Sequence, residues 1–233
     1  MIIYFKKMKS IQQVLKDQKD VYVINSTISY ENYVPFDLSA RHTDELNLDL
    51  TDAEKFEEFV KNHLSANNAE VAFGGYLDRR NLYKRSETFN SENTDERNIH
   101  IGLDLCIKAG TSVLSALDGK IHSFQNNISL GDYGPTIILE HEIEGVTFYT
   151  LYGHLSLESL NGKSEGLLVK KGEKIAELGK PPINGDYAPH LHFQIINNIE
   201  NRKGDYPGVC SSKDVDFYKL NCPDPNLLLK IVS

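Results

Sequence analysis

Four histidines and one aspartate occur in three short apolar segments, which are residues 100–104 (HIGLD), 152–155 (YGHL) and 190–193 (HLHF). Neutral imidazole and carboxylate are ligands that suit zinc. Three protein ligands that leave one position open form a catalytic site rather than a structural one. The two remaining side chains are of types that transfer protons in enzymes. The set therefore predicts a mononuclear zinc hydrolase.

The HLHF segment has the alternation of a strand. Because positions two apart on a strand face the same way, His190 and His192 are expected on one side, with Leu191 and Phe193 on the other. Both imidazoles can therefore reach the same site.

The other two motifs are expected to bring their side chains to the same place. The alternation rule puts Tyr152 and His154 on one side of their strand. Gly102 lies between His100 and Asp104, where a glycine allows a tight bend or a close approach of the backbone to another segment. This bend would let both side chains converge on one cation.

The other four histidines are interpreted as packing or surface residues: His42, His63, His122 and His141. His63 lies beside the apolar stripe of a predicted helix, and His122 and His141 lie on strands near the candidate site. A single histidine on a strand is usually of this kind, but several desolvated imidazoles packed together without a metal would be costly. The three motifs taken together therefore favour a metal site.

The three motifs, in this order and separated by short strand-like segments, resemble those of the lysostaphin-type (LytM-like) zinc endopeptidases over about residues 95–200. Those enzymes cleave peptide bonds in bacterial peptidoglycan on a β-sheet fold called the duplicated hybrid motif. The resemblance implies that His100, Asp104 and His192 bind one zinc ion per chain. It also implies that His154 and His190 flank the activated water as acid and base groups, and that the substrate is a peptide or a peptidoglycan fragment.

One departure from the family pattern and two further residues, Cys106 and Arg97, bear on the predicted site. Related enzymes often carry a tyrosine shortly before the first ligand, thought to steady the oxyanion, and residues 88–98 contain none. Tyr152, Tyr187 or a backbone N–H are the alternatives. Cys106 would share the face of Asp104, and we interpret it as a small buried residue rather than a fourth ligand. Arg97 has two open roles, a salt bridge to a neighbouring acid or a contact with a substrate carboxylate.

The predicted fold is mainly β, with a smaller α/β extension before the catalytic domain. From residue 99 short β-branched segments alternate with glycine turns, which is typical of a compact barrel or sandwich. We predict an N-terminal extension over 1–94, the β domain over 95–200 and a C-terminal tail over 201–233. The stretch 84–98 is polar and rich in turn residues, so we expect a linker or a flap there. Residues 185–189 should form one wall of a substrate groove.

Several local elements are predicted outside the β domain. Capping-box patterns at Ser10 and Thr51 predict a short helix to about Lys16 and an amphipathic helix over 52–66. Residues 21–24 are expected to form a strand. Asp224 and the proline after it predict a short closing helix.

Composition excludes some classes of partner. The formal net charge is −8 and the sequence pI is about 5.5, which argues against a nucleic-acid or membrane-surface partner. The first twenty residues lack the form of a signal peptide, which predicts a cytoplasmic protein, or an extracytoplasmic one if the true start differs. The three cysteines have no CxxC spacing, so free thiols are expected, with a Cys210–Cys222 bridge as the alternative. The oligomeric state stays open.

Three other functions are possible for such a sequence. A phosphocarrier of the same fold would need two histidines and no metal, but it leaves Asp104 and the HLHF pair unexplained. A lipoyl-type carrier is suggested by VKKGEKIAELG at 169–179, but the expected lysine at a hairpin tip is missing. A non-catalytic regulator with an occluded site is the third, although such proteins typically lose ligands and none is lost here.

Overall fold

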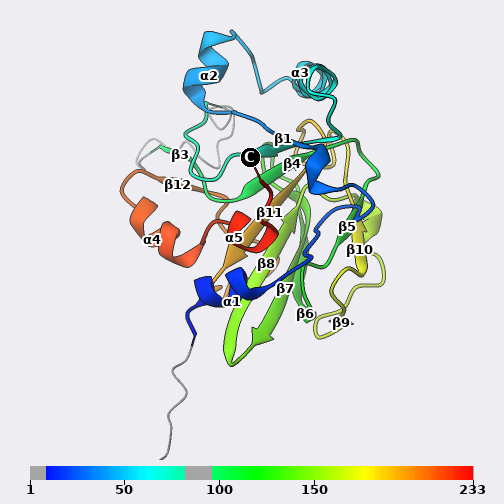
Figure 1. Cartoon of the computed structure of the whole chain (residues 1–233), viewed down its shortest axis with the longest axis vertical. Coiled ribbons are helices and arrows are strands. Elements are labelled where there is room, and N and C mark those ends of the chain that lie inside the picture. Colours follow the sequence, from blue (N-terminus) through cyan, green and yellow to red (C-terminus); the bar gives the residue numbers. More distant parts are fainter. Residues whose placement is uncertain (1–8, 82–95, 233) are drawn as a thin grey trace, which may run out of the picture.

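The structure is a computed structural model that describes residues 9–81 and 96–232. Its centre is a single eight-stranded sheet, shown in Figure 1. The strand order is β1 (Tyr33–Pro35), β2 (Val71–Gly74), β4 (Leu103–Cys106), β11 (His190–Ile196), β8 (Val146–Gly153), β7 (Gly134–Ile143), β6 (Gly119–Asn127) and β9 (Leu168–Val169). All neighbours are antiparallel except β1 and β2. The chain is mainly β, as predicted.

Two small antiparallel sheets flank the large one. In the first, β5 (Ser112–Leu114) pairs with β10 (Lys174–Glu177). In the second, β3 (Arg97–His100) pairs with β12 (Val209–Ser211). The second pair joins the start of the motif region to the C-terminal part of the chain.

Strand β11 shows how the sequence divides the sheet into two faces. Leu191 and Phe193 belong to the largest hydrophobic cluster, together with Leu105 of the neighbouring β4. His190 and His192, one residue out of phase, line a cavity on the opposite face. The alternation predicted for this segment is therefore confirmed, and it separates the core from the polar site.

The N-terminal part adds strands and helices to the large sheet. It contains α1 (Ile11–Asp17), η1 (Tyr30–Asn32), α2 (Ala40–Glu45) and α3 (Ala53–Ala66) besides β1 and β2. The Ser10 capping box is present, and α3 is capped by Asp52 rather than by the predicted Thr51. The predicted strand at 21–24 is wrong, because only Ile24 makes a bridge, to Val113. These residues are held by burial in the core instead.

Three further short helices occur in the described part of the chain. They are η3 (Leu157–Leu160), α4 (Val215–Asn221) and α5 (Asn226–Leu229). The predicted closing helix is α5, and α4 was not predicted. Helix α5 lies beside α1, so the two ends of the described chain meet on one side of the sheet (Figure 1).

The predicted linker or flap falls largely on residues 82–95, which lie outside the described residues. Its last residues, 97 and 98, belong to β3. Within the described ranges, the helices are all too short or too polar to span a bilayer.

Candidate metal centre

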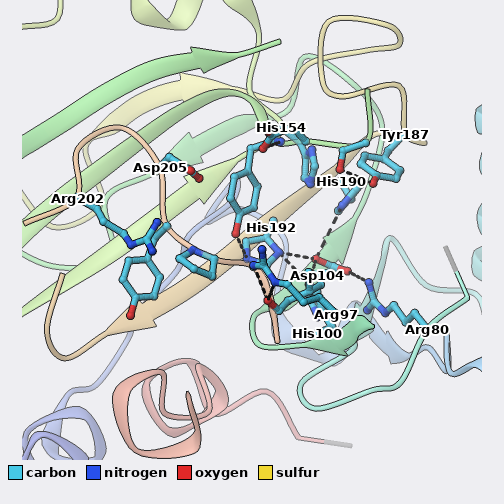
Figure 2. A pocket seen from close by; sticks show the side chains of 17 residues that line it. Arg80, Arg97, His100, Asp104, His154, Tyr187, His190, His192, Arg202 and Asp205 are labelled. Carbon is cyan, nitrogen blue, oxygen red and sulfur yellow. Dashed lines mark hydrogen bonds and ion pairs between the residues drawn. The ribbon is translucent and has the colours of Figure 1, made fainter. Parts of the chain in front are cut away.

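Three side chains converge where β3, β4 and β11 meet. His192 and Asp104 are direct partners across β11 and β4, so their side chains share a face. His100 reaches the same point from the end of β3. Asp104 Oδ1 lies 3.4 Å from both His100 Nε2 and His192 Nδ1, and these two nitrogens are 2.9 Å apart. Figure 2 shows the three groups facing one another.

Gly102 makes this convergence possible. It lies in the turn between β3 and β4, beneath the imidazole of His192. A Cβ atom at this position would lie 2.4 Å from His192 Cε1, which is closer than real atoms approach. The glycine expected from the sequence to allow a close approach therefore does so.

The outer nitrogen of each imidazole is held by an oxygen that only accepts hydrogen bonds. His100 Nδ1 donates to the Gly75 carbonyl at 2.9 Å. His192 Nε2 donates to Gln194 Oε1, also at 2.9 Å, and the Gln194 amide is oriented because its Nε2 donates to the Pro207 carbonyl. In the neutral rings these bonds fix the tautomers, so the lone pairs sit on the inner nitrogens.

The inner atoms form a donor set that suits a cation. His100 Nε2 and His192 Nδ1 direct lone pairs toward each other, and Asp104 Oδ1 is buried with no hydrogen-bond partner among the described residues. Burial lowers the pKa of His100 to about 4, so at neutral pH its inner nitrogen, Nε2, does not carry a proton. Two imidazole nitrogens and one carboxylate oxygen therefore fit a metal ion such as zinc.

Asp104 is ionised, and it has a second partner that the sequence did not suggest. Arg80 Nη1 donates to Asp104 Oδ2 at 2.6 Å, and both side chains are buried. Burial alone would raise the pKa of Asp104, but its interactions with His100 and the Arg80 guanidinium hold that pKa well below its usual range. Arg80 follows a turn with no recognisable motif, so no sequence pattern pointed to it.

His154 and His190 lie next to the three converging groups. Their ring centroids are 4.2 Å apart, and His190 Nε2 is 3.9 Å from Asp104 Oδ1. The Nδ1 atom of His154 donates to the Asn184 carbonyl and that of His190 to the Ala188 carbonyl, each at 2.7 Å. The lone pair of each neutral ring is therefore on Nε2.

Both of these imidazoles are kept neutral. Burial lowers the pKa of His190, and burial together with the neighbouring His190 and His192 lowers that of His154. A neutral imidazole with a free lone pair can accept a proton, and the carbonyl on its other nitrogen stabilises the charged form that results.

The sequence of this region matches a known family. Residues 98–204 match the profile described as peptidase family M23. We call this matched region the M23 domain. The predicted resemblance to the lysostaphin-type peptidases is therefore confirmed, and it covers all five motif residues.

Individual relatives are similar over part of their length. The chain is 29% identical over 121 residues to an uncharacterized metalloprotease of Buchnera aphidicola subsp. Baizongia pistaciae, a match covering 48% of this chain and 28% of that protein. A zinc containing peptidase from Vibrio cholerae is 29% identical over 47% of this chain and 31% of its own, with a TM-score of 0.34. The catalytic domain of lysostaphin from Staphylococcus simulans is 26% identical over 66% of this chain and 94% of its own, with a TM-score of 0.40. Because both TM-scores are low, the family assignment rests on the sequence match.

His154 of the M23 domain reaches the site by a route that strand alternation does not describe. Strand β8 ends at Gly153, and His154 has a left-handed backbone with φ of 62°. Tyr152 therefore points into the large core, where its hydroxyl accepts a hydrogen bond from the Ala116 N–H. The prediction that Tyr152 and His154 share one side is wrong, and Tyr152 is removed as an oxyanion donor.

Two other tyrosines line the cavity of the M23 domain. The Tyr187 ring contacts His154 and His190, but its hydroxyl donates to the Gly131 carbonyl. Tyr133 was missed by the sequence analysis; its hydroxyl lies 3.4 Å from His192 Nε2 and its ring also contacts His154. The sequence feature that could have pointed to Tyr133 is its place in a turn between glycines at 131 and 134.

Two walls of the cavity come from loops. Of the predicted wall at 185–189, Tyr187 lines the cavity. The opposite wall is the segment 205–209, and Arg97 donates two hydrogen bonds to its Val209 carbonyl. Figure 2 shows Arg202 and Asp205 at the end of the cavity away from the histidine pair.

The remaining candidates lie away from the converging groups. The other four histidines do not line the cavity; of these, His141 is buried on β7 and His63 Nε2 contacts the Pro35 carbonyl. Cys106 is buried in a second apolar cluster, as expected, and burial raises its pKa. All three cysteines are free in the structure.

Proposed function

We propose that this chain is a zinc-dependent endopeptidase that hydrolyses a peptide bond by means of an activated water. The observation that carries the proposal is the set of inward-facing lone pairs on His100 and His192 beside the unpartnered Asp104 Oδ1. Two neutral imidazoles lie within reach of the same point. This arrangement contains both a cation site and groups that can transfer protons.

The donor set supports zinc in particular. Two imidazoles and a carboxylate that leave a position open are typical of catalytic zinc sites, whereas calcium and magnesium prefer oxygen ligands alone. The similar Vibrio cholerae peptidase is described as containing zinc. When bound, zinc lowers the pKa of a water molecule to about 7 and polarises a carbonyl group.

His154 and His190 would transfer the protons of the reaction. The lone pair on Nε2 of His154 or His190 accepts a proton from the attacking water, and the resulting imidazolium can pass it to the leaving amine. The Asn184 and Ala188 carbonyls keep each ring in this orientation. We propose that the two histidines share these tasks.

We propose a peptide or a peptidoglycan fragment as the substrate. Support comes from the M23 family match and from the similarity to the catalytic domain of lysostaphin, described as an antimicrobial peptidase. Residues of two loops line the cavity beside the histidines, and we propose that the peptide binds between these loops.

A non-catalytic regulator is the second candidate, because the site is strongly enclosed. The five motif residues are each no more than 6% exposed. The same burial argues against a phosphocarrier, which must present a histidine to a partner protein.

Metal content of the purified wild-type protein, followed by peptidase assays, tests the proposal. We expect about one zinc ion per chain, the stoichiometry of a mononuclear site. We also expect cleavage of peptidoglycan fragments or glycine-rich peptides that a chelator abolishes. Zinc without turnover on any peptide would favour the regulator, and failure to bind added zinc would contradict both.

A further inference from the structure

We propose that Arg80 is a positioning residue that holds Asp104 as a one-oxygen metal ligand, and that segment 74–80 thereby completes the site. The inference rests on the proposed function, since it assigns a supporting role at the proposed zinc site. Arg80 precedes the region that matches the M23 family, which begins at residue 98. The matched domain alone would therefore lack this group.

The two oxygens of Asp104 have separate partners. Oδ2 accepts a hydrogen bond from Arg80 at 2.6 Å, while Oδ1 faces His100 and His192 at 3.4 Å. Charge-assisted bonds of this length are strong and directional. A carboxylate held in this way offers only Oδ1 to a metal, which keeps the number of protein ligand atoms at three.

Gly75 provides the space that the guanidinium occupies. A Cβ atom at Gly75 would lie 1.9 Å from Arg80 Nη2 and 3.1 Å from His100 Nδ1. The residue also has a φ of 103°, which favours glycine. The same residue therefore admits Arg80 and, through its carbonyl, orients His100.

The turn that carries Arg80 is joined to β3 by three backbone hydrogen bonds. The N–H of Leu77 donates to the His100 carbonyl, the N–H of His100 donates to the Asp78 carbonyl, and the N–H of Arg80 donates to the Asn98 carbonyl. Strand β2 pairs with β4 so that Gly74 is opposite Asp104. The segment is thus aligned with two of the three proposed ligands by backbone hydrogen bonds.

A purely structural role is the rival explanation. Asp37 and Asp78 also interact electrostatically with Arg80, so the arginine could serve only to neutralise these nearby acids. This role would affect folding but not the coordination of a bound metal. A spectroscopic measurement of the coordination separates the two roles.

The test replaces zinc with Co²⁺ in the full-length protein and records its visible absorption. Arg80→Met removes the hydrogen bond to Oδ2, so both oxygens of Asp104 become available and the coordination number rises. We expect loss of the intense absorption of four-coordinate Co²⁺. Arg80→Lys, which retains a charged donor, should keep most of it and serves if Arg80→Met does not fold.

Arg79→Gln is the matched control. Arg79 is adjacent in the chain, and its guanidinium bonds to Asn98 Oδ1 and Ser212 Oγ rather than to a proposed ligand. We expect the wild-type Co²⁺ spectrum for this variant. An unchanged spectrum in Arg80→Met would overturn the proposal.

A double-mutant cycle with Asp104→Asn shows whether Arg80 acts through Asp104. Arg80→Met should lower Zn²⁺ affinity by about 10–100-fold in the wild-type background, the usual effect of losing a ligand's supporting partner. It should change the affinity little in the Asp104→Asn background. Equal losses in both backgrounds would contradict the proposal, whereas a wild-type protein that binds no metal would contradict the proposed function as well.

Discussion

Two regions of the molecule bury histidines with very different surroundings. His141 on β7 is fully buried, and burial lowers its pKa to about 4, as it does for His100 in the candidate site. Both ring nitrogens of His141 have a partner, since Nδ1 donates to the Asp118 carbonyl and Nε2 lies 2.7 Å from Thr150 Oγ. In His100 and His192 of the candidate site, only the outer ring nitrogen donates to such an oxygen.

The comparison shows which feature carries functional information. Neither burial nor a lowered pKa distinguishes the two regions. The two regions differ in the partner of the second ring nitrogen. A lone pair left without a partner inside a protein needs a cation, a proton or a substrate. The predictions below separate the two regions experimentally.

The largest effect is expected from removing a proposed ligand. His100→Ala or His192→Ala should abolish zinc binding and activity together, because two donors cannot replace three. His141→Ala should retain one zinc ion per chain while lowering the thermal midpoint. Elemental analysis and thermal denaturation measure both, and zinc retained in His192→Ala would show that the ligand assignment is wrong.

Removing a proton-transfer group should separate binding from turnover. His154→Ala and His190→Ala should each keep zinc, since neither is a proposed ligand, and lower kcat by about 10²–10⁴-fold. Metal content and steady-state kinetics on the same preparations check this. Loss of zinc in either variant would assign that histidine to the metal instead.

Two glycines allow a matched test of the regions. A Cβ at Gly102 would crowd His192, and one at Gly119 would lie 2.7 Å from His141 Nδ1. Gly102→Ala should lower zinc affinity by about 10–100-fold, as disturbed ligand support does. Gly119→Ala should leave that affinity unchanged and reduce only the free energy of unfolding. Chelator competition and urea denaturation provide the measurements, and equal zinc affinities in the two variants would contradict the expectation.

The smallest effect concerns acid stability away from the site. In the unfolded chain His141 titrates near 6.5, and in the folded protein at about 4. Its stabilising contribution is therefore complete above pH 6.5 and is lost as the pH falls from 6.5 to about 4, by about 3 kcal/mol in all. His141→Gln should show a shallower decline of unfolding free energy over this range, measured by urea denaturation in the presence of a chelator. A slope identical to wild type would exclude His141 as its source.

The alternation of HLHF and the glycine in HIGLD predicted correctly how three ligand candidates converge, because both depend on local geometry. His154 was expected at the site because strand alternation would place it beside Tyr152. It reaches the site instead because β8 ends at Gly153 and His154 has a left-handed backbone. Tyr133 was missed because its turn meets the site only through the pairing of distant strands.

The sequence by itself determined which side chains could hold a metal and move protons, because residue type and strand periodicity are local properties. Only the tertiary structure decided how each of these groups is oriented. Gly75 and Arg80 hold His100 and Asp104 through contacts between separate segments of the chain. Gln194 holds His192 from the same strand, but its own amide is oriented by the Pro207 carbonyl of another segment. Such contacts arise from the packing of β2, β3, β4 and β11 against one another, and no short motif encodes them.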